Sequence, residues 1–120
     1  MFIDTRAIGF ALTDGIRGHV EARVESALGP FSKWVVKATV RLEDVNADHG
    51  GDDKRCSIVV ALRRHDVRVA EAIHADLYAA VDKAARRIRR SVRRAIKRQL
   101  TRDRREPQGP AALVTFYVRG

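Results

Sequence analysis

The feature that most constrains the fold is a long amphipathic segment near the C-terminus. Between Asp76 and Arg104, apolar or small residues recur at spacings of three and four, which is the period of one helix face. This face comprises Leu77, Val81, Ala84, Ile88, Val92, Ala95 and Gln99. At 1.5 Å per residue such a helix would be about 44 Å long, more than a small domain can cover. We therefore expect its last turns to project or fray, and we expect His74 or Ala75 at its cap position.

The same segment carries most of the charge of the chain. The protein has 24 Lys and Arg residues against 15 Asp and Glu residues, a formal net charge of +9. Twelve basic residues and one acidic residue lie between Lys83 and Arg105, a net charge of +11. The remaining twelve basic and fourteen acidic residues give −2. One cationic element on a near-neutral body indicates a polyanionic partner, either nucleic acid or an anionic membrane surface.

The spacing of these cations favours nucleic acid. A stripe of Lys83, Arg87, Arg90, Arg94 and Lys97 follows the predicted helix, flanked by Arg86, Arg93 and Arg98. Arginine outnumbers lysine ten to two in the segment, and its planar guanidinium suits bidentate contacts with phosphate. A solvated helix face, balanced by the acidic loop at 48–53, is the ordinary alternative. Because helix-turn-helix spacing, paired metal ligands and an aromatic-rich strand are missing from the sequence, we expect shape and phosphate recognition of folded RNA.

The rest of the chain predicts one helix and four strands. Residues 1–8 suit a first strand, and Thr13 caps a helix that continues to Leu28 and stops at Gly29-Pro30. Alternation from Trp34 places Val36, Ala38, Val40 and Leu42 on a buried face, and a second alternating run does the same for Cys56, Ile58, Val60 and Leu62. A polar loop at 44–53 separates these two strands. The fourth strand, from Val67 to about Ile73, leaves open whether Val69 or Ala70 faces the core.

The resulting order is β-α-β-β-β-α, a two-layer α+β domain. A four-stranded sheet carries both helices on one face, and Lys37, Arg41, Arg55 and Arg63 lie on the other. A right-handed crossover makes the first two strands parallel, and the next three form an antiparallel meander. The domain is expected at 1–105. A short C-terminal tail at 106–120 contains an apolar stretch at 113–118, which either pairs as an extra strand or is irregular.

Catalysis is the weak interpretation. Asp48, His49, Asp52 and Asp53 could in principle hold a metal ion, and His65-Asp66 or His74 with Asp76 could act as acid and base. A glycine-bearing loop preorganises such groups poorly, and the spacing offers no set of nucleophile, base and orienting residue. The single cysteine, Cys56, excludes an internal disulfide and lies on an inward strand face. We expect no enzymatic activity, no cofactor, no metal ion and no small-molecule substrate.

A membrane role is also disfavoured. The sequence has no apolar run long enough for a membrane span, and its first residues do not form a signal peptide. The apolar face of the long helix consists of Ala, Val and Ile, which indicates a face packed on a core rather than one inserted into lipid. We therefore expect a cytoplasmic protein.

Three passages, in order, give the sequence a family resemblance. Leu12-Thr13-Asp14 with Val20-Glu21-Ala22-Arg23-Val24 is similar to the first helix of the ribosome hibernation-promoting factor and ribosome-associated inhibitor family. Leu42-Glu43-Asp44-Val45-Asn46, Gly50-Gly51 and Asp53-Lys54-Arg55-Cys56 resemble its strand–loop–strand passage. Asp76-Leu77-Tyr78-Ala79-Ala80-Val81-Asp82 resembles the opening of its basic helix. The resemblance covers roughly residues 2 to 105.

The resemblance implies a translation inhibitor that lodges in the small ribosomal subunit and occludes the channel for mRNA and tRNA. Its rRNA contacts would come from Lys83, Arg86, Arg87, Arg90, Arg93, Arg94, Lys97 and Arg98, with Arg17 and Arg23 added from the first helix. Long family members carry a second, dimerising domain, and we expect this chain to lack it because few residues follow Arg105. The sequence leaves the oligomeric state open, and we expect a single copy on the ribosome. A general RNA- or DNA-binding module, or a protein-interaction adaptor that uses the basic helix, remains an alternative.

Overall fold

Strands and helices follow one another in the order that the sequence predicts. The computed structural model describes residues 1–45 and 53–105. These residues form β1 (Phe2–Ile8), α1 (Asp14–Leu28), β2 (Val35–Asp44), β3 (Lys54–Leu62), β4 (Asp66–His74) and α2 (Leu77–Arg105), with the 3₁₀ turns η1 (Gly29–Phe31) and η3 (Arg63–His65). The predicted tail and most of the predicted polar loop lie outside the described residues.

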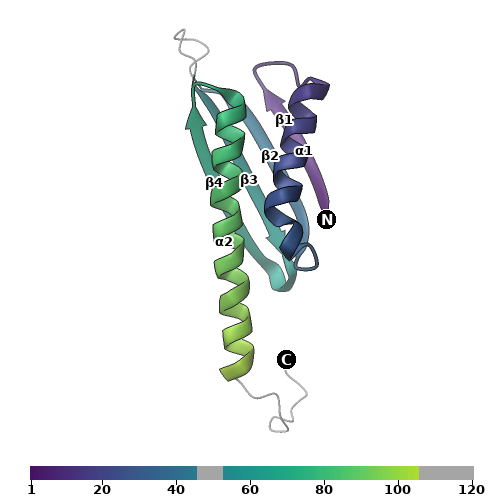
Figure 1. Ribbon diagram of the computed structural model, residues 1–120, viewed down its shortest axis with the longest axis vertical. Coiled ribbons are helices and arrows are strands. Elements are labelled where there is room, and N and C mark those ends of the chain that lie inside the picture. The colour runs from purple at the N-terminus through teal and green to yellow at the C-terminus, as the bar shows by residue number, and fades with distance from the viewer. Residues whose placement is uncertain (46–52, 106–120) are drawn as a thin grey trace.

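The strands form one mixed sheet in the order β1-β2-β3-β4. β1 runs parallel to β2, whereas β2 with β3 and β3 with β4 are antiparallel. Both helices lie against the same face of the sheet, as Figure 1 shows. α1 supplies the crossover that two neighbouring parallel strands require, because a tight turn can join only antiparallel strands. The predicted two-layer α+β architecture is confirmed.

The core lies between this sheet face and the helices. Alternate residues of β2 and β3 point into it, and the predicted inward residues Ala38, Val40, Leu42, Cys56, Ile58, Val60 and Leu62 are all buried. The helices contribute Val20, Val24 and Leu28 from α1 and Val81, Ala84, Ile88, Val92 and Ala95 from α2, which are also buried. The predicted apolar face of the long helix is therefore confirmed as its packing face.

In β2 and β4 the structure shows which side chains face the core. The expectation that Val36 faces the core is wrong, because Val36 is 57% exposed and Val35 is buried instead. A register shift between Val35 and Lys37 causes this, since an extra residue in one strand turns the side chains before it to the opposite face. In β4 the core-facing residues are Ala70 and Ala72, whereas Val69 is 59% exposed.

The helix starts are fixed by side chains that accept backbone hydrogen bonds. Thr13 Oγ1 accepts from the amide of Ile16 at 3.2 Å, which confirms the predicted cap of α1. At α2 the predicted cap, His74 or Ala75, is wrong. Asp76 Oδ1 accepts from the amide of Tyr78 at 3.1 Å, and His74 Nδ1 accepts from the amide of Asp76 at 2.9 Å. A carboxylate next to free helical N–H groups is a better cap than either predicted residue.

α2 is longer than the sheet that supports it. Its 29 residues span about 43 Å at 1.5 Å per residue, and Figure 1 shows the helix continuing past the β3–β4 turn. The predicted projection is confirmed. Near this end Arg64 of η3 donates to Asp103 of α2 at 3.0 Å, so the turn supports the helix where it leaves the sheet.

Candidate nucleic-acid interface

The outward side of α2 presents a continuous series of cations. Ile88 and Val92 are fully buried against the sheet, so the opposite side of α2 points to solvent. We define the α2 basic face as the exposed residues Arg86, Arg87, Arg90, Arg93, Arg94, Lys97 and Arg98. The two acidic residues of α2, Asp82 and Asp103, both form ion pairs with arginines. The charge of the α2 basic face is therefore not neutralised from within its own helix.

The eight predicted α2 residues differ in exposure and in hydrogen bonding. Lys83 is half-buried, and Arg87 Nη1 donates to the backbone carbonyl of Glu71 at the edge strand β4. Their predicted role is therefore shared with packing against the sheet. Arg90, Arg94 and Lys97 are exposed, and their side chains make no ion pair or hydrogen bond within the described residues. The same holds for Arg86, Arg93 and Arg98, so six side chains of the face are available to a partner in the described part of the chain.

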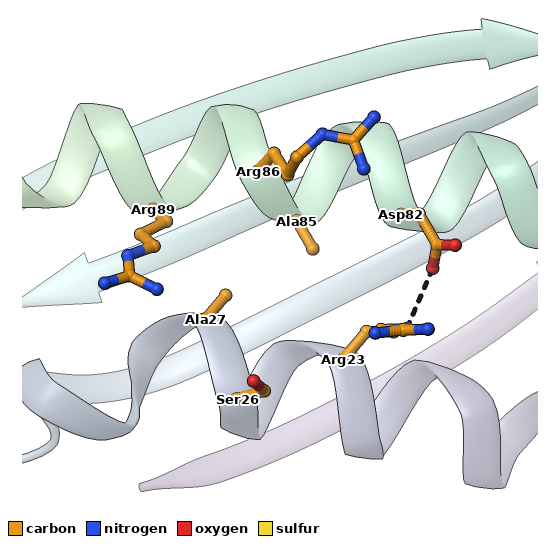
Figure 2. Close-up of a pocket in the computed structure, with 7 residues that line it drawn as sticks. All are labelled: Arg23, Ser26, Ala27, Asp82, Ala85, Arg86 and Arg89. Atoms are coloured by element: carbon orange, nitrogen blue, oxygen red, sulfur yellow. Dashed lines mark ion pairs between the residues drawn. The ribbon is translucent and has the colours of Figure 1, made fainter.

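A groove between the two helices adds further cations. It has a volume of about 280 Å³ and is lined by Arg23, Ser26, Ala27, Asp82, Ala85, Arg86 and Arg89 (Figure 2). The small side chains of Ala27 and Ala85 meet where the helices pack, which leaves room between the longer ones. Three guanidinium groups face one carboxylate, so the lining has a net charge of +2. Such a groove can hold a phosphate group at the junction of α1 and α2.

Asp82 holds the first helix against the second. Its Oδ1 atom accepts from Arg23 Nε at 3.0 Å and lies 2.9 Å from His19 Nε2, so two residues one turn apart on α1 share one carboxylate. The His19 ring stacks on Tyr78 with 4.5 Å between the ring centroids. Tyr78 thus acts as a packing residue at the start of α2. Figure 2 shows the pairing of Arg23 with Asp82 inside the groove.

The predicted contributions from α1 divide in the structure. Arg23 joins Arg86 in the groove, whereas Arg17 is exposed and does not line it. Arg89 is a groove residue that the sequence prediction omits. Arg89 lies beside the predicted stripe, on the side of α2 that faces α1. Only the packing of the two helices, which the periodicity does not encode, brings it beside Arg23.

The described residues offer no catalytic constellation. They contain no group of three or more metal-ligating side chains. Cys56 is buried, and desolvation raises the pKa of its thiol to about 12, so it does not act as a nucleophile near neutral pH. Over the same ranges, none of the helices is long and apolar enough to cross a membrane.

Fold and surface together define a class: a small two-layer α+β domain that presents one arginine-rich helix face. Over residues 3–100 the sequence matches the family described as Sigma 54 modulation protein / S30EA ribosomal protein. The chain belongs to this family of non-catalytic factors of ribosome hibernation and translation inhibition, which confirms the resemblance found in the sequence and the expectation of a protein without enzymatic activity.

Several solved structures share the fold. The N-terminal domain of Protein Y from Thermus thermophilus is 29% identical, with a TM-score of 0.67 over 78% of this chain and 98% of that one. A ribosomal subunit interface protein from Coxiella burnetii is 15% identical, with a TM-score of 0.71 over 81% of this chain and 99% of that one, and at this identity it supports the fold alone. A comparison with curated protein sequences gave no match.

Proposed function

We propose that this protein binds the rRNA of the small ribosomal subunit and inhibits translation by occupying the channel for mRNA and tRNA. The observation that carries the proposal is the α2 basic face, where exposed arginines gather on one side of a domain whose remainder is slightly acidic. Membership in a ribosome-hibernation family supports the ribosome as the polyanion. Inhibition then follows from occlusion, and no bond is made or broken.

The chemistry of the surface suits folded RNA. Guanidinium groups bind phosphate oxygens through two parallel hydrogen bonds, and such contacts carry no base specificity. From Arg86 to Lys97 the face extends about 17 Å along the helix axis, enough to reach several successive phosphates. The α1–α2 groove extends the same surface through Arg23 and Arg89. We infer that the protein recognises the shape of rRNA and its phosphates rather than a base sequence.

Co-sedimentation with purified small subunits at low salt tests this function. The full chain should pellet with the subunits and should inhibit protein synthesis in a reconstituted translation system. A triple variant, Arg90→Ala, Arg94→Ala and Lys97→Ala, should weaken binding by roughly 100-fold, because each charge-assisted contact contributes about 1 kcal/mol or more. Failure of the full chain to pellet at low salt would overturn the proposal.

The open sheet face, with Lys37 and Arg41, and the η3 turn, with Arg63, supply a matched control. The triple variant Lys37→Ala, Arg41→Ala and Arg63→Ala removes the same charge from exposed residues away from the α2 basic face. It should still pellet with the subunits. Equal losses for the two triple variants would show that diffuse charge, and not this helix face, binds the ribosome.

Competition separates ribosome binding from general RNA binding. An excess of bulk duplex RNA should displace a general RNA-binding module from the subunits, whereas a ribosome-specific protein should resist displacement. Pelleting that survives nuclease treatment of the rRNA would instead favour the protein-interaction adaptor.

A further inference from the structure

A second basic pocket lies where α2 crosses the β3–β4 turn. It has a volume of about 250 Å³, and four arginines line it: Arg64 of η3, Arg68 of β4, and Arg98 and Arg102 of α2. We call it the turn pocket. It shares no lining residue with the α1–α2 groove, and about 13 Å of helix separates Arg89 of the groove from Arg98. The turn pocket is therefore a separate concave site.

The charge of the turn pocket is only half compensated. Arg64 pairs with Asp103 at 3.0 Å, and Arg68 pairs with Asp66 at 3.2 Å. In the described ranges, Arg98 and Arg102 form no ion pair and are exposed at the rim. Four guanidinium groups against two carboxylates leave a net charge of +2 in one concavity.

The backbone of the turn is held in an unfavourable conformation. Arg64 and His65 have φ values of 68° and 61°, in the left-handed region that glycine adopts most easily. For a residue other than glycine this conformation costs of order 1 kcal/mol, so glycines at both positions would have lower backbone strain. The conformation directs Arg64 over the end of α2, where it reaches Asp103 and lines the pocket. An arginine at position 64, in spite of this cost, fits a role of its guanidinium group in binding a ligand in the pocket.

The floor of the turn pocket has unmet hydrogen-bonding capacity. Gln99 is 7% exposed, and its Nε2 atom donates to Asp66 at 3.5 Å, which leaves the buried Oε1 atom with no partner among the described residues. Arg68 Nε is a buried donor in the same position. Buried polar atoms are nearly always paired, and the Arg68 Nε donor suits a phosphate oxygen, whereas the Gln99 Oε1 acceptor needs a donor such as water.

We propose that the turn pocket binds one phosphate group, supplied either by an RNA backbone or by a free nucleotide. Arg98 and Arg102 at the rim and Arg64 from the turn donate to its oxygens, and the fork geometry of guanidinium matches a tetrahedral anion with several acceptors. The site does not depend on the ribosome as partner. If the proposed function also holds, the turn pocket is a second phosphate anchor that shares Arg98 with the α2 basic face.

A titration of the full chain with inorganic phosphate, at constant ionic strength set with chloride, tests the site. NMR spectra should show saturable shifts of the Gln99 side-chain amide and of the backbone amides of Arg64 and His65. Arg102→Ala should weaken phosphate binding about tenfold. The control Arg104→Ala removes the same charge two residues further along α2, on the opposite side of the helix, and should leave the affinity unchanged.

A second pair of variants separates the side chain from the strained backbone. Arg64→Gly and His65→Gly relieve the same left-handed conformation, but only Arg64→Gly removes a guanidinium group from the pocket. Arg64→Gly should weaken phosphate binding several-fold and clearly more than His65→Gly, because His65 also lines the pocket but carries no guanidinium group. Equal effects of Arg102→Ala and Arg104→Ala, or shifts spread evenly over the α2 arginines, would overturn the proposal even if the protein pellets with ribosomes.

Two further probes identify the source of the phosphate. Adenosine 5′-diphosphate represents a free nucleotide, and a four-residue ribonucleotide without terminal phosphates represents an RNA backbone. The source is the probe that shifts the same pocket resonances at the lower concentration. Because these measurements contain no ribosomes, their result is independent of the co-sedimentation experiment.

Discussion

At the scale of single residues, burial gives Cys56 a chemistry unlike that of an exposed thiol. Its side chain is 0% exposed on the inward face of β3, and desolvation raises its pKa from 9.0 to about 12. The folded protein therefore keeps the thiol proton at a pH where the unfolded chain has lost it. Fewer protons are then bound in the unfolded state, so the free energy of unfolding falls as pH rises from about 9 to about 12.

This linkage gives a measurable pH dependence. Between pH 9 and pH 11, Cys56 should cost the protein roughly 2 kcal/mol of its free energy of unfolding, at about 1.4 kcal/mol per pH unit above the unfolded pKa. Urea unfolding of the parent and of Cys56→Ala over this range isolates the contribution, because all other titrating groups are common to both. The parent should lose stability more steeply. Parallel curves for the two proteins would contradict a buried neutral thiol.

At the scale of the element, α2 combines a favourable packing face with an unfavourable outward face. Arg86, Arg90 and Arg94 follow one another at spacings of four, where like charges repel by about 0.2–0.5 kcal/mol per pair. The buried residues Ile88 and Val92 must offset this repulsion. A helix selected for stability alone would alternate the signs of its charges. The arrangement fits the proposed binding of a polyanion by the outward face.

A charge reversal should expose this conflict. Arg90→Glu places a carboxylate between Arg86 and Arg94 and so turns two repulsive pairs into attractive ones. We expect the free energy of unfolding to rise by about 1 kcal/mol and binding to the small subunit to weaken. Arg90→Gln, which only removes the charge, should give a smaller gain in stability. Urea unfolding and co-sedimentation measure the two effects, and a loss of stability in Arg90→Glu would contradict the account.

The same scale shows how far sequence reasoning reaches. Alternation predicted every inward residue of β3, and the three–four periodicity predicted the packing face of α2, because both patterns record burial directly. Val36 was misplaced because a bulge breaks the alternation without any signal such as glycine. Sequence reasoning misses the cap at Asp76 because the helical pattern already includes Asp76 as its first residue. Arg89 and the turn pocket depend on which elements lie next to α2, and no local pattern contains that information.

At the scale of the whole molecule, positive charge and core packing are separated by α2 itself. The helix turns its buried residues, such as Ile88 and Val92, toward the sheet and turns the α2 basic face away from it. The rest of the chain carries a net charge of −2. A molecule with this asymmetry approaches a polyanion with α2 in front. The electric field of the cationic side attracts the polyanion, whereas the field of the slightly acidic body does not. The proposed contact surface is thus selected before any short-range contact forms.

This asymmetry predicts how salt should act on each variant. Binding to rRNA releases counterions, and the logarithm of the affinity should fall linearly with the logarithm of the salt concentration, by about 0.7–0.9 per phosphate contact. Replacing Arg90, Arg94 and Lys97 with alanine should therefore flatten the slope by about 2 to 3. The control at Lys37, Arg41 and Arg63 should keep the parent slope, since none of these residues belongs to the α2 basic face or lines the turn pocket. Affinities measured between about 50 and 200 mM salt decide the matter, and a flattened slope in the control would show that the molecule binds without a preferred face.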